Sequence, residues 1–148
     1  MNEAPIVVEQ EYGAPPEVVW QAITDPQQMC QWFFEPIAEF DATVGFSTRF
    51  VVQCEGDDYP HLWDVTEVAA PRRLAYRWRY EGIAGDSFVT WEIDETPNGT
   101  KLTLTHTGHE TFPRDDPAFS RELGVAGWTH FLQTSLKAFL EGDAGQEQ

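Results

Sequence analysis

Apolar and polar residues alternate one by one through the middle of the chain. Because successive side chains of a β-strand point to opposite faces, residues 72–82 predict a strand with one aromatic face and one mostly basic face. The two faces are Leu74, Tyr76, Trp78 and Tyr80 against Arg73, Ala75, Arg77 and Arg79. Related patterns predict further strands over residues 6–12, 35–43, 46–56, 61–69, 87–95 and 100–110.

Apolar residues spaced three and four apart predict two short helices near the start of the chain. The first is expected over residues 14–24, where Pro15 and Pro16 suit a helix start. The second is expected over residues 24–33, with Asp25 as its N-cap. Pro26 and Gln28 then occupy the first-turn and capping-box positions.

A longer helix is expected near the carboxyl end. Asp116 and Pro117 can cap and open it, and it should run to about Leu140, with Gly142 as its stop. Its apolar stripe is expected to consist of Val125, Trp128, Leu132, Leu136 and Phe139.

Together these elements predict an α+β fold with an antiparallel sheet. Consecutive strands joined by short turns favour antiparallel pairing, and the Asn98-Gly99 pair favours a tight hairpin. One face of the sheet should be mostly solvated, because it carries Arg77 and Arg79. The terminal helix is the only long element available to cover the other face.

Length and composition fit one globular domain. The chain has 148 residues, and 41% of them are hydrophobic. A single domain is expected to span residues 1–148. Its ordered core is expected over about 5–141, and residues 142–148 are expected to form a flexible tail. No run is long and apolar enough for a membrane span, and the start carries no export signal, so a cytoplasmic location is expected. Cys30 and Cys54 are expected to be buried thiols.

The charge balance narrows the possible partners. With 25 acidic and 9 basic residues the net charge is −16, which repels phosphate backbones and disfavours nucleic acids and anionic membranes as partners. Few lysines beside so many carboxylates suggest adaptation to high salt. Arg73, Arg77 and Arg79, with Arg49, are expected to pair with carboxylates on adjacent strands, and a small anion-binding patch is the alternative.

Four stretches of sequence, in this order and spacing, resemble a known family. They are "APPEVVWQAITDPQQMCQWF", "VTEVAAPRRLAYRW", "VTWEIDETPNGTKLTLTHTG" and "GWTHFLQTSLKAFL". The chain resembles the START-like superfamily, also called SRPBCC or the birch-pollen-allergen fold, and within it the homologues of the activator of the heat-shock protein 90 ATPase. The resemblance implies a helix-grip fold, in which a curved antiparallel sheet of about six to seven strands wraps a long C-terminal helix. Many members hold an apolar cavity between the two.

An aromatic cavity wall is therefore expected between sheet and helix. The residues expected to line it are Tyr76, Trp78, Phe88, Trp91, His106, Trp128 and Leu132. Phe88 fits only if a bulge intervenes, because alternation places it opposite Trp91. The side chains missing at Gly124 and Gly127 favour open space under the helix, and a fully packed aromatic core is the alternative.

Histidines are the only residues with a credible chemical role. His106 shares its strand face with Leu102 and Leu104, so it is expected to be a hydrogen-bonded core residue or a ligand-recognition group. His61 and His130 are expected to be exposed, and His109 to point away from His106. No spacing fits a metal site, and no cofactor is expected.

The sequence thus favours a protein that binds a hydrophobic small molecule, such as an apolar or aromatic, lipid-like or polyketide-like compound. The first alternative is an enzyme, such as a polyketide cyclase or hydrolase, with His106 as its acid or base. The second is a co-chaperone-like module with a protein partner, which predicts an exposed apolar patch at Trp32-Phe33-Phe34.

Overall fold

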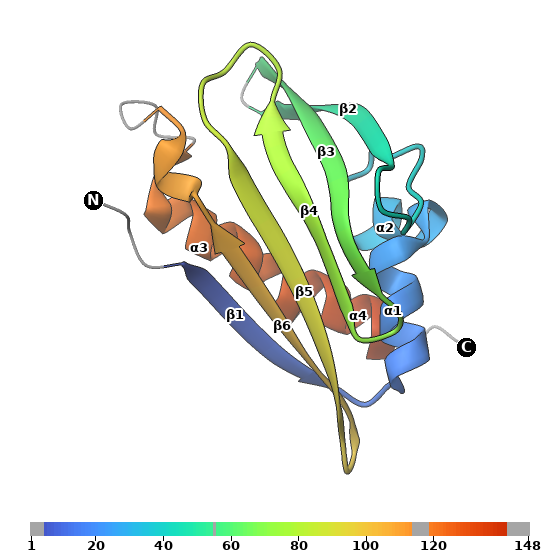
Figure 1. Ribbon diagram of the computed structural model, residues 1–148. Coiled ribbons are helices and arrows are strands. Elements are labelled where there is room, and N and C mark those ends of the chain that lie inside the picture. Colours follow the sequence, from blue (N-terminus) through green and yellow to red (C-terminus); the bar gives the residue numbers. More distant parts are fainter. Residues whose placement is uncertain (1–4, 55, 114–118, 142–148) are drawn as a thin grey trace.

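The computed structural model describes residues 5–54, 56–113 and 119–141, and it shows a curved sheet wrapped around a C-terminal helix (Figure 1). The strands are β1 (Ile6–Tyr12), β2 (Ser47–Cys54), β3 (Asp57–Ala69), β4 (Arg73–Tyr80), β5 (Ser87–Thr96) and β6 (Gly99–Thr107). The helical elements are α1 (Pro16–Thr24), α2 (Pro26–Trp32), η1 (His109–Thr111), α3 (Arg121–His130), η3 (Phe131–Ser135) and α4 (Leu136–Glu141).

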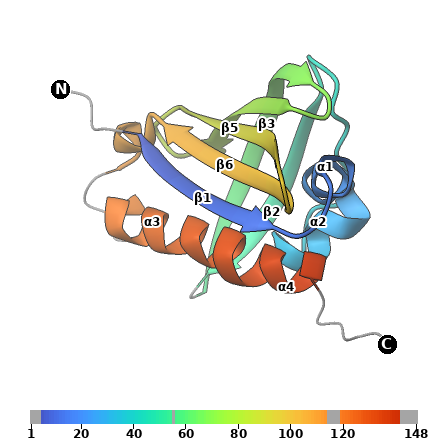
Figure 2. The same cartoon turned by 90° about the horizontal axis from the view of Figure 1, so that it is seen from below.

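All neighbouring strands pair antiparallel, in the order β1-β6-β5-β4-β3-β2. The two short helices α1 and α2 close one end of the sheet, while α3 and α4 run along its concave face (Figure 2). The predicted α+β helix-grip architecture is therefore confirmed. Within the part of the chain that the structure describes, no helix is both long and apolar enough to cross a membrane.

The strand predicted over residues 35–43 is wrong. This segment is an irregular loop that pairs with no strand, although Ile37 and Phe40 are buried in the core. The physical reason lies in the spacing: the two apolar residues are three positions apart, which does not fit the two-residue period of a strand. The loop therefore contributes side chains to the core without extending the sheet.

Strand β3 begins at Asp57, four residues earlier than the sequence pattern indicated. The expected boundary was Pro60, which lacks a backbone N–H. In the structure the Pro60 carbonyl accepts a hydrogen bond from the N–H of Glu81, one residue past the end of β4. The N–H and the carbonyl of one strand residue point to the same side, so an N–H at position 60 would face away from β2. Its absence therefore costs no hydrogen bond with β2, and the strand continues through the proline.

The C-terminal helix is continuous from Arg121 to Glu141, with a π-helical turn, η3, in its middle. Its N-cap is Ser120, whose hydroxyl accepts from the N–H of Leu123. The predicted start at residues 116–117 and the predicted stop at 142 lie outside the described residues. The Tyr12 hydroxyl of β1 donates to the Leu132 carbonyl at 2.6 Å, which satisfies a carbonyl of the π-helical turn.

Three of the five stripe positions of this helix are buried: Trp128, Leu132 and Leu136. Phe139 is half-buried, but Val125 is 38% exposed and was wrongly placed on the covered face. The extra residue that a π-helical turn holds shifts the register between the two halves of the helix, so a single stripe of uniform period does not describe both.

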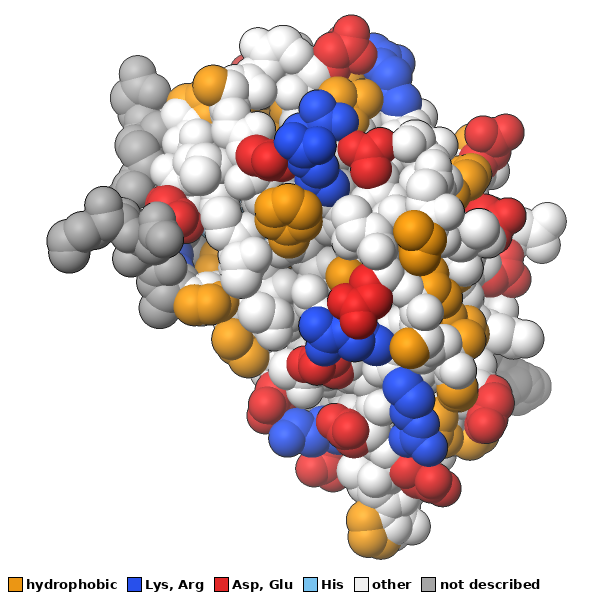
Figure 3. Space-filling model, viewed as in Figure 1, with side chains coloured by type: hydrophobic (Ala, Val, Ile, Leu, Met, Phe, Trp, Pro, Cys, Tyr) orange, Lys and Arg blue, Asp and Glu red, His pale blue; other side chains and the backbone are white. Residues whose placement is uncertain are grey.

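The convex face of the sheet carries alternating charges of opposite sign (Figure 3). Arg77 binds Asp86 with two hydrogen bonds, of 2.7 and 2.8 Å, and Arg79 binds Asp64 at 2.9 Å. Arg73 pairs with Glu67 and Glu92, and Arg49 pairs with Glu81. The predicted pairing of the arginines with neighbouring carboxylates is confirmed. These pairs neutralise the arginines and leave the excess of carboxylates without cations of their own.

We expect the melting temperature to rise by several degrees when the NaCl concentration is raised from about 0.05 M to about 1 M. The added ions screen the repulsion among the carboxylates, because the Debye length falls from more than 10 Å to about 3 Å. Differential scanning fluorimetry measures the change. A variant with three exposed acids neutralised, Glu35→Gln, Glu39→Gln and Asp41→Asn, should show a smaller rise. An equal melting temperature at both salt concentrations would contradict the expectation.

Candidate functional site

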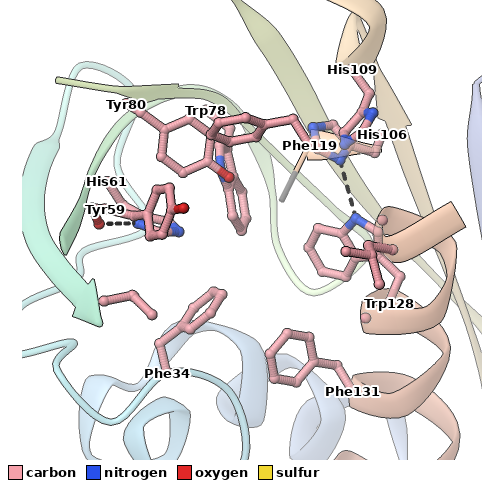
Figure 4. A pocket seen from close by; sticks show the side chains of 14 residues that line it. Phe34, Tyr59, His61, Trp78, Tyr80, His106, His109, Phe119, Trp128 and Phe131 are labelled. Carbon is pink, nitrogen blue, oxygen red and sulfur yellow. Dashed lines mark hydrogen bonds between the residues drawn. The ribbon is translucent and has the colours of Figure 1, made fainter. Parts of the chain in front are cut away.

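A pocket of about 260 Å³ lies between the concave face of the sheet and the first half of the C-terminal helix (Figure 4). The strands β2, β3, β4 and β6 supply one wall, and α3 with η3 supplies the other. The lining residues are Phe34, Val52, Tyr59, His61, Trp78, Tyr80, His106, His109, Phe119, Leu123, Gly124, Gly127, Trp128 and Phe131.

The pocket exists because the helix presents backbone where other helices would present side chains. A Cβ added at Gly127 would have no atom within 4 Å, so the space beside it is open. Gly124, one turn earlier, is packed closely: a Cβ there would lie 3.1 Å from Nε2 of His109 and 3.2 Å from Cδ1 of Ile6. The helix is therefore closely packed at Gly124 and has open space beside Gly127.

The lining is aromatic and uncharged. None of the 14 lining residues in the described part of the chain is Asp, Glu, Lys or Arg, although these types make up 23% of the sequence. The rings contact one another in edge-to-face and tilted pairs. Trp78 and Trp128 lie 5.5 Å apart, and Phe34 and Phe131 lie 5.2 Å apart. Such a wall favours apolar ring systems and disfavours ions.

His106 forms the floor of the pocket and is held by hydrogen bonds on both ring nitrogens. The indole Nε1–H of Trp128 donates to Nδ1 at 3.1 Å, so Nδ1 carries no proton. Nε2 then carries the proton and donates to the Ser87 hydroxyl at 2.9 Å, which in turn donates to the Trp78 carbonyl at 2.7 Å. Burial, with a smaller effect of nearby His109, lowers the pKa of His106 to about 3.

His61 stands at the opposite end of the pocket. It is only 4% exposed and stacks on Phe50 with ring centroids 4.9 Å apart. Its Nδ1 lies 2.8 Å from the Tyr59 carbonyl, and because a carbonyl only accepts, Nδ1 must carry the proton. Burial lowers the pKa of His61 to about 4, so both histidines are neutral at pH 7.

The structure divides the seven residues that the sequence assigned to the cavity. Trp78, His106 and Trp128 line the pocket. Tyr76, Trp91 and Leu132 face inward but lie outside the pocket, in the packed core. The Trp91 Nε1–H donates to the Tyr76 hydroxyl at 3.0 Å, and Trp32 of α2 packs edge-on against Trp91. The α2 end of the interior is therefore filled, and the open space lies toward α3.

Phe88 was wrongly placed in the cavity wall. It is 43% exposed on the convex face, and β5 pairs with both neighbours around it without a register shift. No bulge turns its side chain inward, so the ordinary alternation of the strand decides its position.

Two further histidine predictions are wrong, and both residues line the pocket. His61 was expected to be exposed, but the early start of β3 places it on the inner face with Trp63 and Val65. His109 was expected to point away from His106, yet the two rings lie 5.4 Å apart. Gly108, with φ of 82°, ends the strand in a left-handed conformation and turns η1 back over the pocket.

Some of the missed lining residues carried a readable signal. Tyr59 and His61 continue the alternation of Trp63 and Val65, and Pro60 alone obscured it. Phe34, Phe119 and Phe131 carried no such signal, because neither Phe34 nor Phe119 continues a periodic pattern in the sequence and Phe131 lies in the π-helical turn.

The remaining assignments are mixed. His130 is exposed, as predicted. Cys30 is only half-buried, and the side chain of Cys54 lies outside the described residues. Trp32 and Phe33 are buried at 2% and 8% exposure, so they do not form the exposed patch that a protein-interaction module required.

Comparisons with known proteins extend over almost the whole chain. The profile of one protein family, described as activator of Hsp90 ATPase homolog 1-like protein, matches residues 13–141. The crystal structure of CV1439 from Chromobacterium violaceum is similar with a TM-score of 0.78 and 25% identity, covering 94% of this chain and 98% of that one. No curated protein sequence matches the chain.

Two further solved structures share 28% identity with the chain. DynU16, a protein in the dynemicin biosynthetic locus, has a TM-score of 0.75, and the match covers 95% of this chain and 48% of DynU16. This chain therefore spans about half the length of DynU16. CalU16 from Micromonospora echinospora has a TM-score of 0.66, with 96% of this chain and 79% of CalU16 covered.

Proposed function

The chain belongs to the family of activator of Hsp90 ATPase homolog 1-like proteins, and from this premise we propose that it binds a small, uncharged aromatic molecule between its sheet and its C-terminal helix. The observation that carries the proposal is the uncharged ring-lined pocket in a chain whose net charge is −16. A charged ligand would lose its hydration there without gaining a counter-charge. An aromatic ligand gains from burial and from edge-to-face contacts with the lining rings.

The volume of the pocket bounds the size of the ligand. At about 260 Å³ it lies just below the roughly 300 to 1,000 Å³ of pockets that take drug-sized ligands. A dry apolar cavity of about 150 Å³ holds one benzene ring. A ligand of two or three fused rings therefore matches the space. The likeness to a protein of the dynemicin biosynthetic locus supports a role with a small organic molecule.

Binding without covalent chemistry fits the state of His106 better than catalysis does. A general base needs a free lone pair within reach of the substrate. Both nitrogens of His106 are used, one by Trp128 and one by Ser87, and its pKa of about 3 makes it a weak base. In this proposal His106 has a structural role: its hydrogen bonds to Trp128 and Ser87 hold the helix against the sheet.

Thermal-shift measurements with two uncharged probes, 2-methylnaphthalene and 2-naphthol, and the anion 2-naphthoate test the proposal. A ligand at about 100 times its Kd stabilises the folded state by about 2.7 kcal/mol. We expect the uncharged probes to raise the melting temperature by several degrees and 2-naphthoate to leave it unchanged. Equal shifts with all three probes, or none with any, would overturn the proposal.

Gly127→Leu should abolish these shifts, because its side chain would occupy the open space beside the helix. Gly in a helix interior costs about 0.8 to 1 kcal/mol relative to Ala, and Leu ranks next to Ala, so the variant should be at least as stable as the wild type without ligand. The matched control is Ala126→Leu, at the neighbouring exposed position outside the pocket, which should retain the shifts. Loss of binding in both variants would contradict this placement of the ligand.

A further inference from the structure

At one end of the pocket three rings with polar atoms, His61, Trp78 and Tyr80, lie close together (Figure 4). The His61 ring lies 5.3 Å from Trp78 and 4.7 Å from Tyr80, measured between ring centroids. The three rings come from the adjacent strands β3 and β4, whose register pairs His61 with Tyr80 and Trp63 with Trp78.

His61 offers this space a hydrogen-bond acceptor. Its Nδ1–H is committed to the Tyr59 carbonyl at 2.8 Å, so the neutral ring keeps its lone pair on Nε2. No residue within 5–54, 56–113 or 119–141 gives Nε2 a hydrogen bond, and this nitrogen is turned toward the interior of the pocket (Figure 4).

Trp78 and Tyr80 supply the aromatic rings that flank this acceptor. The Nε1–H of Trp78 has no hydrogen-bond partner among the described residues, but the surrounding protein encloses it, so it does not face the pocket. The acceptor that a ligand meets at this end is therefore Nε2 of His61.

We propose that this end of the pocket recognises the hydroxyl group of a phenol, so that the aromatic ligand is a hydroxylated one. The inference rests on the proposed function. The ligand hydroxyl donates its proton to Nε2 of His61, while its rings extend toward Trp128 and Phe131. The hydroxyl thereby pairs the free acceptor of this ring. An ether or a methyl group at the same position cannot donate to His61 and leaves Nε2 unpaired.

The test compares 2-naphthol with the nearly isosteric 2-methylnaphthalene in the wild type and in His61→Phe. The Phe ring keeps the stacking on Phe50 but has no acceptor nitrogen. Because the same two probes are compared in both proteins, differences in their hydrophobicity cancel. We expect the ratio of the two Kd values to shift by about tenfold against 2-naphthol in His61→Phe. Fluorescence titration of the tryptophans supplies the Kd values.

A measurement on the wild type alone keeps the test independent of how the variant folds. In ¹⁵N-histidine NMR spectra, 2-naphthol should shift the Nε2 resonance of His61, and 2-methylnaphthalene should leave the nitrogen in its unbonded range. If both probes bind but neither the Kd ratio nor the Nε2 resonance responds to the hydroxyl, the phenol inference falls and the proposed function stands. If neither probe binds at saturation, the proposed function falls and this inference falls with it.

Discussion

Acidification from pH 7 to pH 4 is expected to remove about 6 kcal/mol from the free energy of unfolding through His61 and His106 alone. Folding lowers the pKa of these rings from 6.5 to about 4 and about 3. Between those values and pH 6.5 the unfolded chain binds more protons than the folded chain does. The stabilisation is therefore complete above pH 6.5 and is lost as the pH falls toward 4.

The size of this effect is large beside the total stability of a domain, which is about 5 to 15 kcal/mol. Each ring contributes about 3 kcal/mol at pH 4, since one pKa unit corresponds to about 1.4 kcal/mol. No carboxylate lines the pocket in the described part of the chain, so nothing there compensates the charge of a protonated ring. For His106, protonation would also break the bond from Trp128, because Nδ1 would then carry a proton.

Urea denaturation at pH 7, 6, 5 and 4 measures the loss. The protonation of surface carboxylates acts in the opposite direction, since it relieves repulsion in a chain of net charge −16. The double variant His61→Gln and His106→Gln separates the two effects, because it retains the carboxylates and lacks both titrating rings. A wild type and a variant with the same dependence of stability on pH would show that these rings do not titrate with lowered pKa values.

Truncation of Trp91 to alanine is expected to lower the free energy of unfolding by about 3 to 5 kcal/mol. Trp91 is 1% exposed, and its removal leaves a cavity that Trp32, Phe33 and Trp128 now line. The change also removes the hydrogen bond of its Nε1–H to the buried Tyr76 hydroxyl. Urea denaturation at pH 7.5 measures the loss, and near-ultraviolet circular dichroism checks that the remaining tryptophans stay ordered.

Phe88→Ala provides the matched control three residues earlier on the same strand. Its side chain is 43% exposed on the convex face, so truncation should cost less than about 1 kcal/mol and leave the binding of 2-methylnaphthalene unchanged. The sequence analysis assigned both aromatics to the cavity wall, and for Phe88 this assignment required a bulge that the structure does not contain. Equal losses of stability in the two variants would contradict the assignment of these residues to opposite faces of β5.

Local patterns in the sequence accounted for most of the fold. Alternation identified the inner faces of β4, β5 and β6, because neighbouring side chains on a strand must point to opposite sides. The Asp25 side chain caps α2 by accepting from the N–H of Gln27, as its place before Pro26 indicated. These features depend on residues close in the chain, so the sequence alone was sufficient.

The pocket depended on relations that no local pattern contains. Alternation assigned Tyr76 and Trp78 to the same inner face of β4, and it could not tell that Tyr76 would be packed by Phe40 while Trp78 would border open space. That difference is decided by a loop without regular structure and by the spacing between helix and sheet near Gly127.

The sequence by itself determined the class of this protein: the strand faces, the two short helices, the covering helix and the acidic surface. Only the tertiary structure decided where the interior is filled and where it is hollow, and it alone brought His61 and His109 to the hollow part. The physical reason is that periodicity fixes the direction of a side chain, whereas a cavity depends on how the volumes of side chains from distant segments add up around one point.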